Sequence, residues 1–137
     1  MKSILVFGMF LLTSSLWSQS CCEGAFADLG ESETFKDAHE IPTSIEYSAV
    51  GENITFPTST GTDGRAYLIK SATPSTKYLL VIHEWWGLND HIKKEADKFA
   101  VSIPNINVIA VDLYDGNVTS EHDKAAEYMQ AAKEDRL

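Results

Sequence analysis

The sequence predicts an α/β fold in which an antiparallel meander of strands leads into a β-α-β unit. Residues 78–82 and 108–111 are apolar at every position, as in parallel strands that are buried on both faces. Between these two runs, apolar side chains recur at helical spacing over residues 92–103, so the two strands should be parallel neighbours joined by a right-handed crossover. Earlier residues alternate apolar and polar side chains between turn signals, which predicts short antiparallel strands over residues 45–49, 54–56 and 66–69.

Local signals also predict where the helices begin and end. Asn89 or Asp90 is expected to cap the helix after the first buried strand, and Pro104 ends that helix. Thr119 or Ser120 can start a second helix, which then continues without a Gly or Pro stop signal. A parallel sheet should continue after this helix with another strand. The sheet is therefore expected to be incomplete within these 137 residues.

The composition indicates one acidic globular domain, expected over residues 44–137, with residues 21–43 as a linker before it. The length suits a single domain, and 44% hydrophobic and 23% charged residues argue against wholesale disorder. The formal net charge is −9, and no cluster of Lys or Arg interrupts the acidic surface. Such a surface repels phosphate backbones and anionic lipids, so nucleic acid is not expected as a partner.

Residues 1–20 are typical of an export signal. Lys2 supplies the positive start, residues 4–12 form an apolar centre too short to span a bilayer, and Ser18-Gln19-Ser20 provides small residues for a signal peptidase. A buried N-terminal helix or a membrane anchor is the alternative. Export predicts a periplasmic or extracellular protein. No later run reaches membrane length, so an integral membrane protein is not expected.

The expected linker contains a short helix near residues 31–38 and begins with two adjacent cysteines. Neighbouring cysteines seldom form a disulfide with each other, and two thiols alone make a poor metal site. Cys21 would become the first residue of the mature protein and could then carry a lipid anchor. Against this, Ser18 stands where a lipoprotein signal usually has Leu. Cys22 has no predicted role.

The end of the first buried strand, within residues 81–91, carries the candidate functional residues. Open α/β sheets bind their ligands at the carboxyl ends of parallel strands. Glu84 follows the strand beside two indoles, surroundings that suit a carboxylate with an acid-base role. Its alternative role is an ion pair or a helix cap. Two consecutive tryptophans are difficult to bury together at such a corner, so one of Trp85 and Trp86 is expected to line a pocket.

Other polar residues are assigned structural or solvent-exposed positions. His83 should point to the opposite face of the strand from Glu84 and be a structural histidine, hydrogen-bonded under a helix. Asp112 follows the second buried strand and is expected to fix a neighbouring loop. The remaining candidates are expected to be solvated: His39, Glu40, His91 and His122.

No motif indicates a metal, a cofactor or an activated nucleophile. His83, Glu84 and His91 lack the spacing of a zinc motif. The sequence contains no Gly-x-Gly-x-x-Gly, no phosphate loop, and no Gly-x-Ser-x-Gly or Gly-x-Cys-x-Gly elbow. From the residues alone we expect no cofactor and no metal, and only half of an active site.

Residues 81–89, with His-Glu-Trp-Trp-Gly at their centre, and residues 108–114, which end in Asp-Leu-Tyr, resemble the front half of a dienelactone hydrolase. The resemblance implies the N-terminal part of an α/β-hydrolase fold. The family hydrolyses esters and lactones with a Cys, less often a Ser, nucleophile that His and Asp assist. The resemblance further implies that Glu84 activates the nucleophile and that the backbone N–H of Trp85 contributes to the oxyanion hole. Trp86 is then the candidate for the substrate pocket.

The sequence departs from the family in what it lacks. The nucleophile elbow, the acid and the catalytic histidine have no counterpart here, and neither Cys21 nor Cys22 matches the nucleophile. We therefore expect an N-terminal fragment of an exported ester or lactone hydrolase, inactive alone and without the strand that would pair beside residues 78–82. The alternative is a small acidic secreted binding module, not an enzyme, that uses the corner at Trp85 and Trp86.

Overall fold

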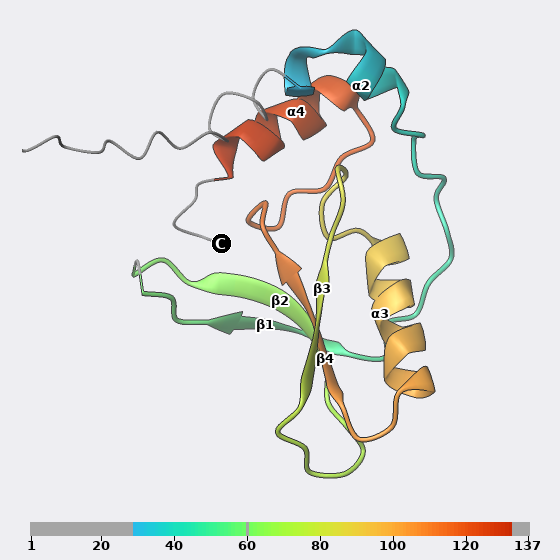
Figure 1. Cartoon of the computed structure of the whole chain (residues 1–137), viewed down its shortest axis with the longest axis vertical. Helices are drawn as coiled ribbons and strands as arrows, with labels where there is room; N and C mark the ends of the chain where they lie inside the picture. The colour runs from blue at the N-terminus through green and yellow to red at the C-terminus, as the bar shows by residue number, and fades with distance from the viewer. Residues whose placement is uncertain (1–28, 60, 133–137) are drawn as a thin grey trace, which may run out of the picture.

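The computed structural model describes residues 29–59 and 61–132, which form a four-stranded mixed sheet with helices around it (Figure 1). The strand order is β1-β2-β4-β3. The elements in chain order are α2 (Glu33–Asp37), β1 (Glu52–Phe56), β2 (Gly64–Ile69), β3 (Tyr78–Ile82), α3 (Asp90–Ser102), β4 (Asn107–Asp112) and α4 (His122–Ala131). The expected export signal over residues 1–20 and both cysteines lie outside the described residues.

Strand pairing confirms the predicted β-α-β unit and most of the meander. β1 pairs with β2 and β2 with β4, both antiparallel, whereas β3 and β4 are parallel neighbours joined through α3. The predicted strand over residues 45–49 is wrong, because this segment has no regular secondary structure. The Tyr47 hydroxyl instead binds Asp97 on α3 at 2.5 Å. Side-chain bonds rather than a backbone ladder hold this segment, and alternation of apolar residues cannot distinguish the two.

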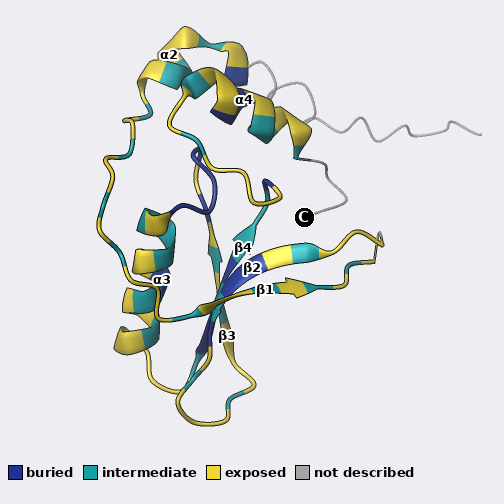
Figure 2. Ribbon diagram, turned by 180° about the vertical axis from the view of Figure 1, so that it is seen from behind, coloured by how far each residue is buried: buried dark blue, intermediate teal, exposed yellow. Residues whose placement is uncertain are grey.

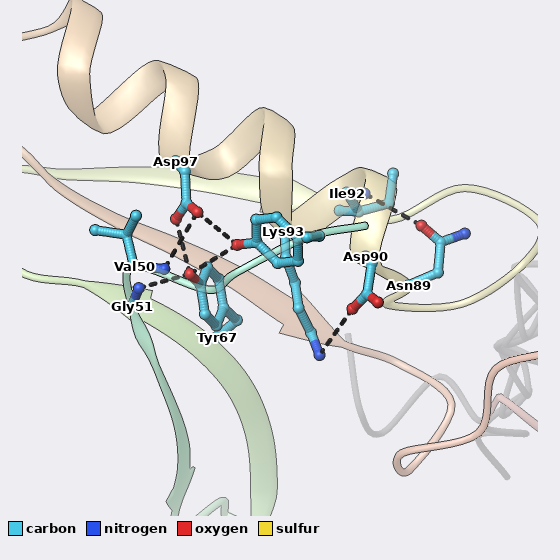
Figure 3. A network of polar contacts seen from close by, with 9 residues as sticks. Val50, Gly51, Tyr67, Asn89, Asp90, Ile92, Lys93 and Asp97 are labelled. Carbon is cyan, nitrogen blue, oxygen red and sulfur yellow. Dashed lines mark hydrogen bonds and ion pairs between the residues drawn. The ribbon is translucent and has the colours of Figure 1, made fainter. Parts of the chain in front are cut away.

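Asp97 is the centre of a polar cluster that ties α3 to β2 and to the segment before β1 (Figure 3). Its Oδ1 accepts a hydrogen bond from the Tyr67 hydroxyl at 2.7 Å, and that hydroxyl accepts one from the backbone N–H of Gly51 at 2.6 Å. Its Oδ2 accepts from Tyr47 and, at 3.4 Å, from the backbone N–H of Val50. Burial is the main cause that raises the pKa of both tyrosines above the ordinary value.

The main core lies between α3 and the sheet, with the central strand β4 at its middle. Tyr67 of β2, Val108 of β4 and Ala96 of α3 are among its fully buried members. Figure 2 shows buried residues in the paired strands β2 and β4 and in the loop after β3. Asn89 caps α3 as predicted, because its Oδ1 accepts a hydrogen bond from the backbone N–H of Ile92 at 3.1 Å. This cap fixes where the loop after β3 ends.

β3 is an edge strand among the described residues, with β4 as its partner. The prediction that both of its faces are buried is wrong here. Tyr78, Leu80 and Ile82 are 62%, 57% and 60% exposed, whereas Leu79 and Val81 are half-buried against the core. α3 packs on one face of β4 and β2, and no described helix covers the other face of β3. The continuous apolar run correctly predicted a strand with apolar residues on both faces. Among the described residues, however, only one of these faces is covered by other parts of the chain.

α2 and α4 lie together beyond the carboxyl end of β4 (Figure 1). α4 begins at His122 after the N-cap residue Glu121, slightly later than predicted. α2 falls within the short helix expected in the linker, and it is attached to the start of α4 by an ion pair of 2.9 Å between Lys36 and Asp123. Within the described part of the chain, no helix is long and apolar enough to span a bilayer.

Candidate active site

His83 joins the carboxyl ends of the two parallel strands. The backbone N–H of Leu113, just after β4, donates to His83 Nε2 at 3.1 Å. Nε2 is therefore an unprotonated acceptor, and Nδ1 carries the proton that it donates to the carbonyl oxygen of Glu84 at 2.8 Å. His83 is buried and structural, as predicted, but its partners are the loop after β4 and the Tyr114 ring, 4.6 Å away between centroids, rather than a helix.

Glu84 begins a tight turn directly after β3. The backbone N–H of Gly87 donates to the Glu84 carbonyl oxygen at 3.3 Å, and the backbone N–H of Trp86 donates to Glu84 Oε2 at 3.2 Å. The carboxylate is thus held over the turn that it starts, while the residue stays exposed. An exposed carboxylate in a fixed orientation at the end of a parallel strand can accept a proton or a hydrogen bond from a group placed above the sheet.

Gly87 makes this turn sterically feasible. Its φ is +86°, in the left-handed region that side chains with a Cβ avoid. A Cβ at this position would also collide with the carbonyl oxygen of Asn117, in the loop after β4. The turn after β3 and the loop after β4 therefore approach each other at a distance that only glycine permits. This close approach is the physical reason why a glycine, Gly87, ends the His-Glu-Trp-Trp-Gly motif.

Trp85 is buried, at 5% exposure, between α2 and α4. Its ring lies 5.1 Å from that of Phe35 and 5.0 Å from that of His39, between centroids. Its indole N–H is buried and has no hydrogen-bond partner among the residues that the structure describes. The backbone N–H of Trp85 forms no hydrogen bond with any described residue.

Trp86 is also buried, at 3% exposure, so the expectation that the two indoles cannot be buried together is wrong. The reason lies far away in the sequence: α2, α4 and residues 38–43, here called the strap, cover this corner. The Trp86 indole N–H donates to the carbonyl oxygen of Glu40 in the strap at 3.1 Å. Trp86 nevertheless lines a pocket, although it is almost fully buried.

Histidines attach the strap to the rest of the molecule. His91 Nε2 lies 2.7 Å from the carbonyl oxygen of Thr43, and His122 Nε2 lies 3.1 Å from that of His39. The expectation that these histidines are solvated is therefore wrong. His91 and His122 do lie on polar faces of their helices. Their partners are 48 and 83 residues distant in the sequence, however, so helical periodicity carries no signal for them.

An open pocket of about 520 Å³ lies between the strap and the turn that Glu84 starts. The strap contributes its whole length to the lining. The other lining residues are Glu84, Trp86, Asn89 and His91. The structure thus brings the predicted residues Glu84 and Trp86 to one pocket, together with strap residues that no sequence pattern predicted to lie there.

The loop after β4 forms the other neighbour of the corner. Asp112 Oδ1 accepts a hydrogen bond from the backbone N–H of Tyr114 at 3.0 Å, so Asp112 fixes this loop as predicted. Burial, and secondarily the negative charge of Glu84, raises the pKa of Tyr114 to about 12. Tyr114 therefore stays protonated at neutral pH. Within residues 29–59 and 61–132, no group of three His, Cys, Asp or Glu side chains is placed to hold a metal ion.

A sequence model of the dienelactone hydrolase family matches residues 65–136, more than half of the chain. The chain belongs to the dienelactone hydrolase family. The match begins at the start of β2 and includes the corner at Glu84, and the mixed sheet is consistent with part of an α/β-hydrolase fold. Membership in this hydrolase family implies an ester substrate. The strap, α2 and β1 lie before the matched residues. No curated protein sequence matches the chain.

Proposed function

We propose that this chain forms one wall of the active site of an ester or lactone hydrolase. In this proposal Glu84 activates the nucleophile, and the backbone N–H of Trp85 is a donor of the oxyanion hole. The observation that supports this proposal is the turn after β3, which lies inside the segment matched by the family model. In this turn the backbone N–H of Trp86 orients the carboxylate of Glu84, whereas the backbone N–H of Trp85 has no partner among the described residues. One such donor is worth about 10²–10³ in rate.

The proposed hydrolysis requires the groups of this corner, which are the Glu84 carboxylate and the Trp85 backbone N–H, and in addition a nucleophile. A carboxylate that accepts a hydrogen bond from a thiol or hydroxyl increases its nucleophilic character, and a fixed N–H stabilises the oxyanion that forms when this group attacks an ester carbonyl. The printed sequence has no nucleophile elbow, and no cysteine lies among the described residues. We therefore propose that the nucleophile, the acid and the catalytic histidine come from polypeptide beyond these 137 residues. The chain alone is then inactive.

Substitution of Glu84 by Gln tests this role. In the protein encoded by the complete reading frame, Glu84→Gln should lower kcat for γ-butyrolactone and p-nitrophenyl acetate by about 10²-fold, with a smaller change in KM, because general acid–base assistance contributes about this much. Glu95→Gln is the matched control, since Glu95 is exposed on α3 and pairs with Lys98. An unchanged kcat in Glu84→Gln contradicts the proposed role.

A binding module without catalysis is the second candidate, and the pocket beside Trp86 is the observation in its favour. It predicts that a protein from the complete reading frame binds a small apolar ligand at this pocket and hydrolyses no ester or lactone. Turnover that depends on Glu84 excludes it.

Export is proposed from residues 1–20 alone. Mass spectrometry of the mature protein should find an N-terminus at Cys21 in the periplasm or medium, with the mass of an attached lipid if Cys21 is an anchor. A protein recovered from the cytoplasm with residues 1–20 intact contradicts export.

A further inference from the structure

The indole of Trp85 is held by a segment that precedes the family match. The match begins at residue 65, whereas Phe35 belongs to α2 and His39 to the strap. The Phe35 ring meets the indole edge to face at 5.1 Å between centroids, and the His39 ring lies at 5.0 Å with its plane tilted by 30°. The two rings are also fixed to each other, because His39 Nδ1 donates to the carbonyl oxygen of Phe35 at 2.7 Å. The Trp85 side chain thus depends on contacts that the family model does not cover.

The strap is in turn fixed to α4 and to the corner itself. His122 Nε2, on α4, donates to the carbonyl oxygen of His39 at 3.1 Å, and the Trp86 indole N–H donates to that of Glu40, also at 3.1 Å. These two bonds hold consecutive carbonyl oxygens, so they fix the backbone that carries the His39 ring. The ring therefore keeps its place against Trp85, whose side chain is buried at 5% exposure.

The backbone at Trp85 has one rotation that these ring contacts can limit. The Glu84–Trp85 peptide bond is trans, so its carbonyl oxygen and its N–H point in opposite directions. The carbonyl oxygen of Glu84 accepts hydrogen bonds from His83 Nδ1 at 2.8 Å and from the backbone N–H of Gly87 at 3.3 Å. These bonds still allow some rotation of the peptide plane about the line between its two Cα atoms. An indole fixed among other rings restricts φ of Trp85 and thereby this rotation.

We propose that Phe35 and His39 are positioning residues of the oxyanion hole, which hold the Trp85 indole and thereby set the direction of the Trp85 backbone N–H. This inference rests on the proposed hydrolase function, in which that N–H is the donor. Complete loss of one donor costs about 10²–10³ in rate, and a displacement of about 1 Å can cost about 10²-fold. Removal of one of the two rings should displace the donor only part of the time, so the expected loss is smaller, about ten-fold.

Comparison of an ester with its thionoester tests the direction of the donor. The substrates are p-nitrophenyl acetate and the analogue with sulfur, a weaker acceptor, in place of the carbonyl oxygen. In the protein encoded by the complete reading frame, Phe35→Ala should reduce the ratio of their kcat/KM values, ester over thionoester, by about ten-fold, and His39→Ala should act in the same direction. A smaller folded fraction cancels in this ratio, because both substrates meet the same enzyme. An unchanged ratio in Phe35→Ala overturns the inference.

Further variants separate positioning from general stability. Phe35→Tyr keeps a ring at the edge of the indole and should retain the ratio within about two-fold. Asp97→Ala destabilises the fold at the polar cluster of Figure 3, away from the corner, and should leave the ratio unchanged. If Phe35→Ala does not fold, Phe35→Leu keeps apolar volume without an aromatic edge and should reduce the ratio about three-fold. An equal reduction in Asp97→Ala overturns the inference.

Hydrogen exchange followed by NMR separates this inference from the proposed function. The Trp86 backbone N–H, which donates to Glu84 Oε2 at 3.2 Å, reports local opening of the turn, and the backbone amides of the paired strands β2 and β4 report opening of the fold. In Phe35→Ala the Trp86 amide should exchange about ten-fold faster relative to the strand amides than it does in the unsubstituted protein. If no ester is hydrolysed, the hydrolase proposal fails, whereas this acceleration still supports the role of Phe35 in holding the turn. Equal acceleration of the turn and strand amides overturns the inference.

Discussion

Replacement of Asp97 by Ala should destabilise the fold through the polar cluster of Figure 3. Asp97 accepts hydrogen bonds of 2.7 Å from the Tyr67 hydroxyl and 2.5 Å from the Tyr47 hydroxyl. A hydrogen bond to a charged group contributes about 1.5–3 kcal/mol. The two contributions do not add fully, because the hydroxyls remain partners of each other at 2.9 Å. We expect Asp97→Ala to lower the free energy of unfolding by about 2–4 kcal/mol.

Urea denaturation followed by tryptophan fluorescence measures this change, since Trp85 and Trp86 are both buried. Glu95→Ala on the same helix is the control, because its exposed ion pair with Lys98 should contribute less than about 1 kcal/mol. An effect of Asp97→Ala below about 1 kcal/mol, or equal to that of the control, would refute the assignment of Asp97 as the attachment of α3 to β2 and the segment before β1.

Two further predictions concern pH and the turn. Because burial raises the pKa of Tyr47 and Tyr67 in the folded state, their contribution to stability is fully present below the ordinary tyrosine pKa of about 10 and is lost as pH rises above it. The urea midpoint should therefore be constant to about pH 9 and fall by pH 11, less steeply in Tyr47→Phe; a constant midpoint to pH 11 contradicts this. Gly87→Ala should lower the free energy of unfolding by more than about 2 kcal/mol, because strain at positive φ adds to the collision with Asn117. Gly61→Ala, at φ +83° with nothing within 4 Å, should show the backbone strain alone, and equal thermal shifts for the two variants would exclude the collision.

The β-α-β unit could be predicted because each of its signals is local. The helical spacing of apolar residues, the cap at Asn89 and the apolar runs of β3 and β4 all act within a few residues of one another. The strand expected over residues 45–49 failed for the complementary reason. Its alternation is real, but its partner is Asp97, 50 residues away from Tyr47, and not a neighbouring strand. The periodicity of apolar residues shows which side of a segment is apolar, but it does not show which part of the chain that side contacts.

Half of the candidate site was predictable in the same way. Glu84 and Trp86 could be located because a ligand site is expected where a parallel strand ends, and both line the pocket. The strap was not predictable, since residues 38–43 contain no periodic pattern and no motif. Its place depends on three carbonyl oxygens that accept hydrogen bonds from Trp86, His91 and His122.

The sequence by itself determined the type and order of most elements, the corner at residues 83–87 and the family, because these depend on local periodicity, turn chemistry and a contiguous motif. The tertiary structure alone decided that both tryptophans are buried, that three supposedly solvated histidines hold or pack against other parts of the chain, and that Glu40 shares a pocket with Glu84. Each of these outcomes needs two segments 40 or more residues apart in the chain to meet. Contacts of this kind depend on packing in three dimensions, which leaves no regular pattern along the sequence.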